Sequence, residues 1–400
     1  MKGCKLSRSL PLLALLALGW LAAASRAAPT PTLELWIGSD KGYRAAAEIG
    51  RRYQRATARR VIVRHFDNLP AAFEQAAAAG EGPDILIWAH DRYGEWAARG
   101  LIVPVQPSER FRQGIAPFTW SALRIGEQLY GYPIAVETVG LIYNRRLIEQ
   151  PPGDFEQLFR LAPDLRQRAI VPIAWDYTNT YFSWGLLSAN GGFAFAQRAD
   201  GFDPRTTGVD HPGAVAGARL LQRLLQQRVL AAELTGNRAL TAFSQGKVAL
   251  TIGGPWVWGA LQAAGIDFGV APLPRVAGAA ARPFVGVWAA AVTRWARHPD
   301  WAGEFLEQYL LSPAGLRALN ADRPLGAVAN RELMGELAAD PRVDQTFLSA
   351  VGGEMMPNLA QMGRFWRAMQ QALEQITEQG VDPAAALSQA REAILALPEG

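Results

Sequence analysis

The sequence predicts an α/β protein built from mostly parallel sheets with helices on both faces. Short runs of β-branched and aliphatic residues alternate with longer amphipathic stretches, beginning with LELWI at Leu33. A helical stretch follows from Tyr43 to Ala56, and the next apolar run, VIVRHF, ends at Phe66. The chain has 400 residues, 50% of them hydrophobic, which is enough to form the cores of two domains.

The same alternation continues along the chain. A second helix precedes a strand at 84–87, and a further strand is expected from Gly131 to Val136. From about Thr138 the apolar runs are LIYN, IVPIAW and VALTIGG. After Pro283 come VGVWAAAV and a helical stretch from Trp301 to Leu311, and the C-terminal part is expected to be helical.

Two lobes joined by several chain crossings are expected, because no Ser/Gly-rich linker divides the sequence. The extended pieces near 135–140 and 284–286 are the predicted hinges. The predicted division is a signal peptide at 1–27, a first lobe at 28–136 plus 287–341, and a second lobe at 137–286 plus 342–400.

The N-terminal residues have the features of a secretory signal peptide. Basic residues precede an apolar run over 10–24, and the small residues Ser25 and Ala27 follow it. A membrane span usually requires about 18 or more apolar residues, and this run is shorter. We therefore expect cleavage after Ala27 and an exported protein, with an uncleaved membrane anchor as the alternative.

The charge of the chain argues against an anionic partner. The formal charge is +4, but the signal peptide would remove Lys2, Lys5, Arg8 and Arg26 and leave a neutral mature chain. Nucleic acid and anionic membranes attract a clustered positive face, so neither is expected as a partner.

The single cysteine, Cys4, precedes the apolar run, so the mature chain is expected to have no disulfide.

Motifs for metal and nucleotide chemistry are missing from the sequence. The 4 histidines have no HxxxH or HExxH spacing, and GxGxxG, GxxxxGK[ST] and GxSxG do not occur. We therefore expect no metal and no cofactor. Carboxylates at the predicted strand ends, Asp40, Asp91 and Glu137, leave a glycosidase pair separated by roughly 5 to 10 Å as an alternative from the enzyme class.

Peptides that combine aromatic rings with carboxylates and amides occur from Leu35 to Trp366. A sugar has an apolar C–H face that a ring can cover, and a rim of hydroxyls that needs charged or amide partners. Such peptides therefore suit a carbohydrate ligand.

Several of these polar side chains come at predicted strand ends. Asp40 and Lys41 follow the first strand, Trp88 to Arg92 follow the strand at 84–87, and Glu137 follows the strand that ends at Val136. Loops at the carboxyl ends of parallel strands gather at one edge of a sheet, so these residues are expected to face one cleft. Trp36, Trp120 and Trp184 instead lie in apolar runs and are expected in the core.

At these peptides the chain resembles the maltose/maltodextrin-binding protein family, the periplasmic receptors of ABC sugar importers. The similarity extends from Leu33 to about Leu373. The peptides that match occur in the family's order: LWIGSDKGY, GPDILIWAHDRYG, YPIAVETVGLIYN, TYFSWGLLSANGG, TIGGPWVW, RPFVGV, RPLGAVA and GEMMPNLAQMGRFW. The resemblance implies a type II periplasmic binding protein fold, with two lobes and a hinge segment at Phe284 to Gly286.

The resemblance also implies a set of ligand-binding residues. Those expected to hydrogen-bond sugar hydroxyls are Asp40, Lys41, Asp91, Arg92 and Glu137. Those expected to border the subsites or stack on the sugar are Trp88, Ala89, Tyr181, Trp256, Met356 and Trp366. The implied partners are ABC permease subunits in the inner membrane, with a chemoreceptor as a further candidate, and the protein is expected to be a monomer.

The chain departs from the family pattern at several positions. The family has glutamate at Asn179, acidic residues at Pro70 and Ala71, asparagine at Gly38, arginine at Gln370, and tyrosines at Gly236 and Arg367. Because the aromatic and inner polar residues are kept, the resemblance implies maltose or a short maltodextrin as the ligand. Trehalose and sucrose remain alternatives.

Overall fold

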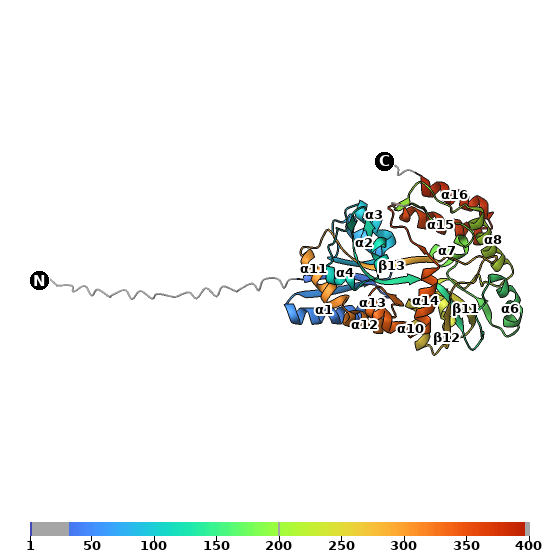
Figure 1. Ribbon diagram of the computed structural model, residues 1–400, viewed down its shortest axis with the longest axis horizontal. Helices are drawn as coiled ribbons and strands as arrows, with labels where there is room; N and C mark the ends of the chain where they lie inside the picture. The colour runs from blue at the N-terminus through green and yellow to red at the C-terminus, as the bar shows by residue number, and fades with distance from the viewer. Residues whose placement is uncertain (2–31, 199–200, 397–400) are drawn as a thin grey trace.

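The computed structural model describes Met1 and residues 32–198 and 201–396 (Figure 1). The predicted signal peptide after Met1 and its cleavage site at Ala27 lie outside the described residues. The described chain forms two mixed sheets surrounded by helices, which confirms the α/β class. Within these ranges, no helix combines the length and apolar character that a membrane span requires.

The larger sheet has seven strands in the order β14-β6-β13-β3-β1-β2, with β15 paired to β13. Strand β1 is parallel to β2 and β3, whereas β13 is antiparallel to both β3 and β6. The sheet is therefore mixed rather than mostly parallel, because β13 enters it from the opposite end. Its strands are β1 (Thr32–Gly38), β2 (Arg60–Phe66), β3 (Ile85–Ala89), β6 (Tyr132–Thr138), β13 (Phe284–Val292), β14 (Ala327–Val328) and β15 (Glu354–Met355).

The smaller sheet has four strands in the order β12-β7-β11-β8. Strand β7 is antiparallel to β11 and β12, and β8 is parallel to β11. Its strands are β7 (Gly140–Asn144), β8 (Val171–Ile173), β11 (Val248–Gly253) and β12 (Phe268–Ala271). Two short antiparallel pairs lie outside both sheets: β4 (Arg124–Ile125) with β5 (Gln128–Leu129), and β9 (Ala196–Arg198) with β10 (Gly201–Asp203).

Helices from distant parts of the sequence surround each sheet. In Figure 1, blue α1 and orange α11 and α12 lie together on one side, and α6 and α8 lie on the other. The helices are α1 (Tyr43–Thr57), α2 (Leu69–Ala78), α3 (Tyr93–Ala98), α4 (Glu109–Gln113), α5 (Pro117–Ala122), α6 (Phe155–Gln167), α7 (Thr180–Ser188), α8 (Pro212–Gln226), α9 (Gly236–Ser244), α10 (Trp258–Ala263), α11 (Pro299–Phe305), α12 (Pro313–Asp322), α13 (Arg331–Leu337), α14 (Pro341–Val351), α15 (Met362–Thr377) and α16 (Pro383–Leu395). Single turns occur at η1 (His90–Arg92) and η2 (Pro255–Val257), and a π-helical turn, η3 (Leu306–Leu310), continues α11.

Helix α1 illustrates how the sequence pattern produces this packing. Its buried residues, Ala46, Ile49, Gly50 and Tyr53, recur at intervals of three and four positions and form one face. Gly50 lies so close to β2 that an added Cβ would be 2.9 Å from the Val61 Cβ. Glycine therefore allows the helix to pack directly on the sheet.

The chain passes between the two sheets at the segments predicted as hinges. Strand β6 continues through Val139 into β7, which belongs to the other sheet, and β13 begins after the return from β12. The Thr138 hydroxyl donates a hydrogen bond to the Phe284 carbonyl over 2.8 Å and ties these two passages together. The lobe boundaries and the hinge motion stay predictions.

Strand boundaries differ from the prediction at the residues nearest the cleft. Trp88 and Ala89 lie within β3, and Glu137 lies within β6, although they were expected to follow the strands. Each is extended by pairing with β13, where Ala89 lies opposite Trp288 and Glu137 opposite Gly286. These pairings join distant segments, which a local hydrophobic pattern does not report.

Candidate ligand-binding site

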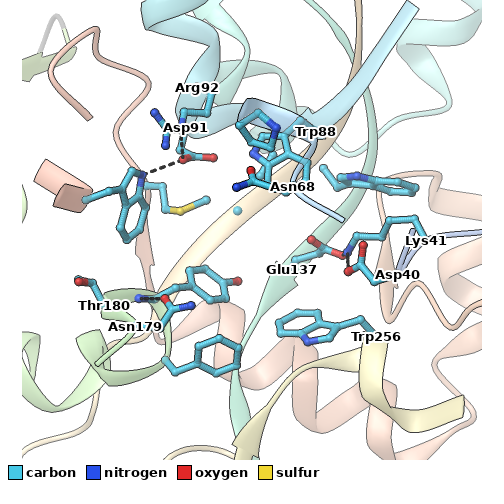
Figure 2. Close-up of a pocket in the computed structure, with 18 of the residues that line it drawn as sticks. Asp40, Lys41, Asn68, Trp88, Asp91, Arg92, Glu137, Asn179, Thr180 and Trp256 are labelled. Atoms are coloured by element: carbon cyan, nitrogen blue, oxygen red, sulfur yellow. Dashed lines mark hydrogen bonds and ion pairs between the residues drawn. The ribbon is translucent and has the colours of Figure 1, made fainter. Parts of the chain in front are cut away.

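A cavity of about 600 Å³ lies between walls that belong to both sheets (Figure 2). One wall comes from the loop after β1, from β3 with η1, from β6 and from β13. The other comes from α7, η2 and α15. The lining residues are Asp40, Lys41, Asn68, Pro70, Trp88, Ala89, Asp91, Arg92, Glu137, Asn179, Thr180, Tyr181, Phe182, Trp256, Gly286, Trp288, Met356, Trp366 and Gln370.

The structure brings every predicted site residue to this cavity, from Asp40 to Trp366. The sequence reasoning missed Asn68, Thr180, Phe182 and Trp288. Trp288 lies in the run VGVWAAAV and is 1% exposed, so its local pattern is that of a core residue. Its place in the cavity depends on which side of β13 faces the cleft.

The three tryptophans predicted to lie in the core are buried away from the cavity. Trp36 and Trp120 are each 8% exposed, and Trp184 is fully buried. Trp184 stacks on Phe284 with ring centroids 4.6 Å apart and donates a hydrogen bond to the Glu354 carboxylate over 3.2 Å. The prediction that these rings serve packing is confirmed.

One end of the cavity contains a buried cation between two carboxylates. The Lys41 ammonium pairs with Glu137, and its Nζ lies 3.7 Å from Asp40 Oδ2. Burial by itself lowers the pKa of Lys41, but the negative charges of Glu137 and Asp40 outweigh it, and the pKa is raised. Lys41 therefore remains charged.

Aromatic rings surround this cation. The Lys41 Nζ lies 5.3 Å from the ring centroids of both Trp256 and Trp288, within the range of a cation–π interaction. Trp256 also contacts Tyr181, with centroids 6.2 Å apart and planes tilted by 46°. A turn that starts at Pro255, two residues after β11, sets Trp256 at the end of the smaller sheet.

The other end of the cavity is built around Asp91, which is 6% exposed. The Trp366 indole Nε1 donates a hydrogen bond to Asp91 Oδ2 over 2.9 Å, and Arg92 Nε lies 4.0 Å from the same oxygen. Burial raises the pKa of Asp91 to about 6, although the Arg92 charge and the Trp366 N–H oppose this effect. Figure 2 shows Asp91 and Arg92 on the opposite side of the cavity from Lys41 and Glu137.

Between these two ends of the cavity, buried His90 links the backbones of Val287 and Met356 by hydrogen bonds. The Val287 N–H donates to His90 Nδ1 over 2.9 Å, so Nε2 carries the proton that is donated to the Met356 carbonyl at 2.8 Å. Burial lowers the pKa of His90 to about 4, which keeps the ring neutral. The Met356 side chain lies over Gly286, where an added Cβ would be 2.7 Å from Met356 Cε.

Two positions that depart from the family pattern lie in the cavity wall with their side chains already engaged. Asn179 accepts a hydrogen bond from the Tyr181 N–H at 3.1 Å as the N-cap of α7, and it also hydrogen-bonds Asp176. Gln370 donates to Glu374 Oε1 over 2.9 Å. Pro70 is a further departure among the described lining residues, whereas Gly38, Ala71, Gly236 and Arg367 are not among them.

Two mixed sheets joined by extended crossings, with an aromatic and polar cavity between them, define a two-lobed solute-binding protein. The chain belongs to the family of bacterial extracellular solute-binding proteins, whose family model matches residues 48–343. The family membership predicted from the sequence is thereby confirmed.

Curated relatives of the chain include oligosaccharide receptors. It is 28% identical over 360 residues to a maltotriose-binding protein of Pyrococcus abyssi, covering 85% of this chain and 76% of the relative. It is 27% identical over 326 residues to a galactooligosaccharide-binding protein of Bacillus subtilis, covering 78% and 76%. A maltodextrin-binding protein of Bacillus subtilis is 26% identical over 319 residues, covering 74% of each chain.

Proposed function

We propose that this protein binds maltose or short maltodextrins in the cavity and delivers them to an ABC importer. The observation that carries the proposal is the combination of tryptophan rings with buried, paired ionic groups at both ends of the cavity. Ring faces suit the apolar C–H surfaces of a sugar, and fixed charges suit its hydroxyls. Relatives named for maltotriose and maltodextrin support this ligand class. Trehalose and sucrose remain alternatives.

The proposed roles follow the chemistry of each side chain. Asp40, Lys41, Asp91, Arg92 and Glu137 would hydrogen-bond the ligand hydroxyls. Trp88, Tyr181, Trp256 and Trp366 would contact the sugar rings, and Ala89 and Met356 would line the surface between them. Contacts from both walls would then favour a closed cleft, because a ligand shifts such an equilibrium only by its different affinity for the two states.

Thermal unfolding with a panel of sugars tests the proposal. A ligand at about 100 times its dissociation constant should add roughly 2.7 kcal/mol to the free energy of unfolding. We expect stabilisation by maltose and maltotriose but not by lactose. Stabilisation by trehalose or sucrose alone would show that the ligand is that sugar and not a maltodextrin. No response to any sugar would refute the proposal that the protein is a carbohydrate receptor.

We also propose that the protein is not an enzyme. Lys41 contacts both Glu137 and Asp40, an arrangement that suits fixed ionic partners for hydroxyls better than a proton donor and nucleophile. Prolonged incubation with maltotriose should therefore release neither glucose nor maltose, and product formation would favour the glycosidase alternative. The proposed setting is a periplasmic monomer that docks on inner-membrane permease subunits, with a chemoreceptor as a further candidate partner.

A further inference from the structure

The Trp366–Asp91 hydrogen bond joins the two walls of the cavity directly. Asp91 lies in η1, immediately after β3 of the larger sheet, whereas Trp366 lies on α15. Helix α15 packs against α7, α8 and α16, and Trp366 contacts the hydrophobic core that also contains Leu141 and Leu250 of the smaller sheet. The contact therefore crosses the cleft.

The orientation of the Trp366 ring is set by two other rings. Phe284 meets it at 71° with centroids 5.3 Å apart, and Phe365 meets it at 76° with centroids 5.2 Å apart. Edge-to-face contacts on a half-buried ring restrict its rotation. The Nε1–H consequently keeps one direction, toward Asp91 Oδ2.

The surroundings of Asp91 make this N–H important. Arg92 and Glu95 are the charged groups that act on it, and Arg92 is shared, because its Nη1 lies 3.4 Å from Glu95 Oε2. Tyr93 and Tyr181 also face Asp91, and burial raises the pKa of both phenols well above their ordinary value, so both stay neutral. Among the described residues, Trp366 is the side chain that donates a hydrogen bond to Asp91.

We propose that Trp366 is a positioning residue as well as a ring surface: its N–H holds one oxygen of ionised Asp91 and directs the other to a ligand hydroxyl. The same bond draws the two walls of the cleft together. The inference deepens the proposed function and rests on it for the identity of the ligand. The link between Trp366 and the ionisation of Asp91 can nevertheless be tested without any sugar.

The first test is a carboxyl ¹³C NMR titration of Asp91 in the protein without added sugar. Trp366→Phe keeps an aromatic ring and removes the N–H, so the Asp91 midpoint should move to higher pH by about one pH unit, the equivalent of one charge-assisted hydrogen bond. Trp256→Phe is the matched control, because Trp256 lies beside Lys41, and should leave the midpoint unchanged. An unchanged midpoint in Trp366→Phe would overturn the proposal.

The second test is calorimetry with maltotriose between pH 5 and pH 8. Wild-type affinity should fall as the pH decreases through about 6. Trp366→Phe should bind about tenfold more weakly at pH 7, with its profile displaced to higher pH, whereas Trp256→Phe should bind more weakly without that displacement. If wild type binds no maltotriose, the proposed ligand fails, and the NMR titration still decides the role of Trp366. Equal profiles for the two variants would contradict that role.

Discussion

The two ends of the cavity bury ionic groups to a similar degree but give them different partners. At one end Lys41 lies between Glu137 and Asp40, and its pKa is raised although burial alone would lower it. At the other end Asp91 has a neutral indole donor and a shared arginine, and burial raises its pKa to about 6. The comparison shows that the partner, rather than burial alone, decides whether a charge is permanent or titratable.

The largest effect is expected from breaking the permanent pair. Glu137→Gln leaves the Lys41 ammonium, whose side chain is 11% exposed, without its nearest counter-charge. Removing one member of a buried ion pair typically costs about 3 kcal/mol or more of folding free energy. Urea denaturation at pH 7 should therefore show a loss of about 3 kcal/mol.

Asp40→Asn is the matched control for that prediction. The Asp40 carboxylate is 53% exposed and lies 3.7 Å from Lys41, so its removal should cost less than about 1 kcal/mol. Equal losses for the two variants would mean that burial does not distinguish the two carboxylates.

At the Asp91 end of the cavity, removal of the charge should stabilise the folded protein instead of destabilising it. The pKa of Asp91 is higher in the folded protein than in the unfolded chain, so its ionisation opposes folding as the pH rises from about 4 through 6. Asp91→Asn removes the charge and keeps an acceptor for the Trp366 N–H. We expect a gain of about 2 kcal/mol in the free energy of unfolding at pH 8.

The difference between wild type and Asp91→Asn should disappear below about pH 3, where Asp91 is protonated in both the folded and the unfolded chain. Thermal unfolding from about pH 3 to pH 8 measures this dependence. Sugar affinity should fall in the same variant. A variant less stable than wild type at pH 8 would show that the Asp91 charge is better compensated than its burial indicates.

A substitution between the two ends tests whether one ligand spans them. In Gly286→Ala the new Cβ would be 2.7 Å from Met356 Cε, and the flexible side chain must move into the cavity. Stability should change by less than about 1.5 kcal/mol, and sugar affinity by calorimetry should fall about tenfold. Gly286→Ala with Met356→Ala should restore part of the affinity. Wild-type affinity in the single variant would place the ligand away from this surface.

The smallest effect is expected at the uncharged wall. Asn179 caps α7, so Asn179→Ala should cost about 1 kcal/mol of folding free energy in urea denaturation. Asn179→Ser keeps a capping oxygen and should lose only a few tenths of a kcal/mol of folding free energy. A similar loss in both variants would assign the effect to the Asp176 contact instead of the cap.

Local sequence patterns predicted much of the fold. The expected helix from Tyr43 to Ala56 is α1, because its apolar residues recur at the helical period. The antiparallel placement of β13 between β3 and β6 was not predicted, since it pairs Trp288 with Ala89 and Ala135 across long stretches of chain. The lengths of β3 and β6 depend on those pairings and were predicted too short.

The sequence by itself determined the kinds of side chain available to the cavity, because strand ends and short ordered peptides carry that information locally. Only the tertiary structure decided their partners. Trp366 and Asp91 are 275 positions apart and Lys41 and Glu137 are 96 apart, so their pairing depends on how distant segments pack. Burial and partner together set the charge of each group, and both arise only when segments distant in the sequence pack against one another.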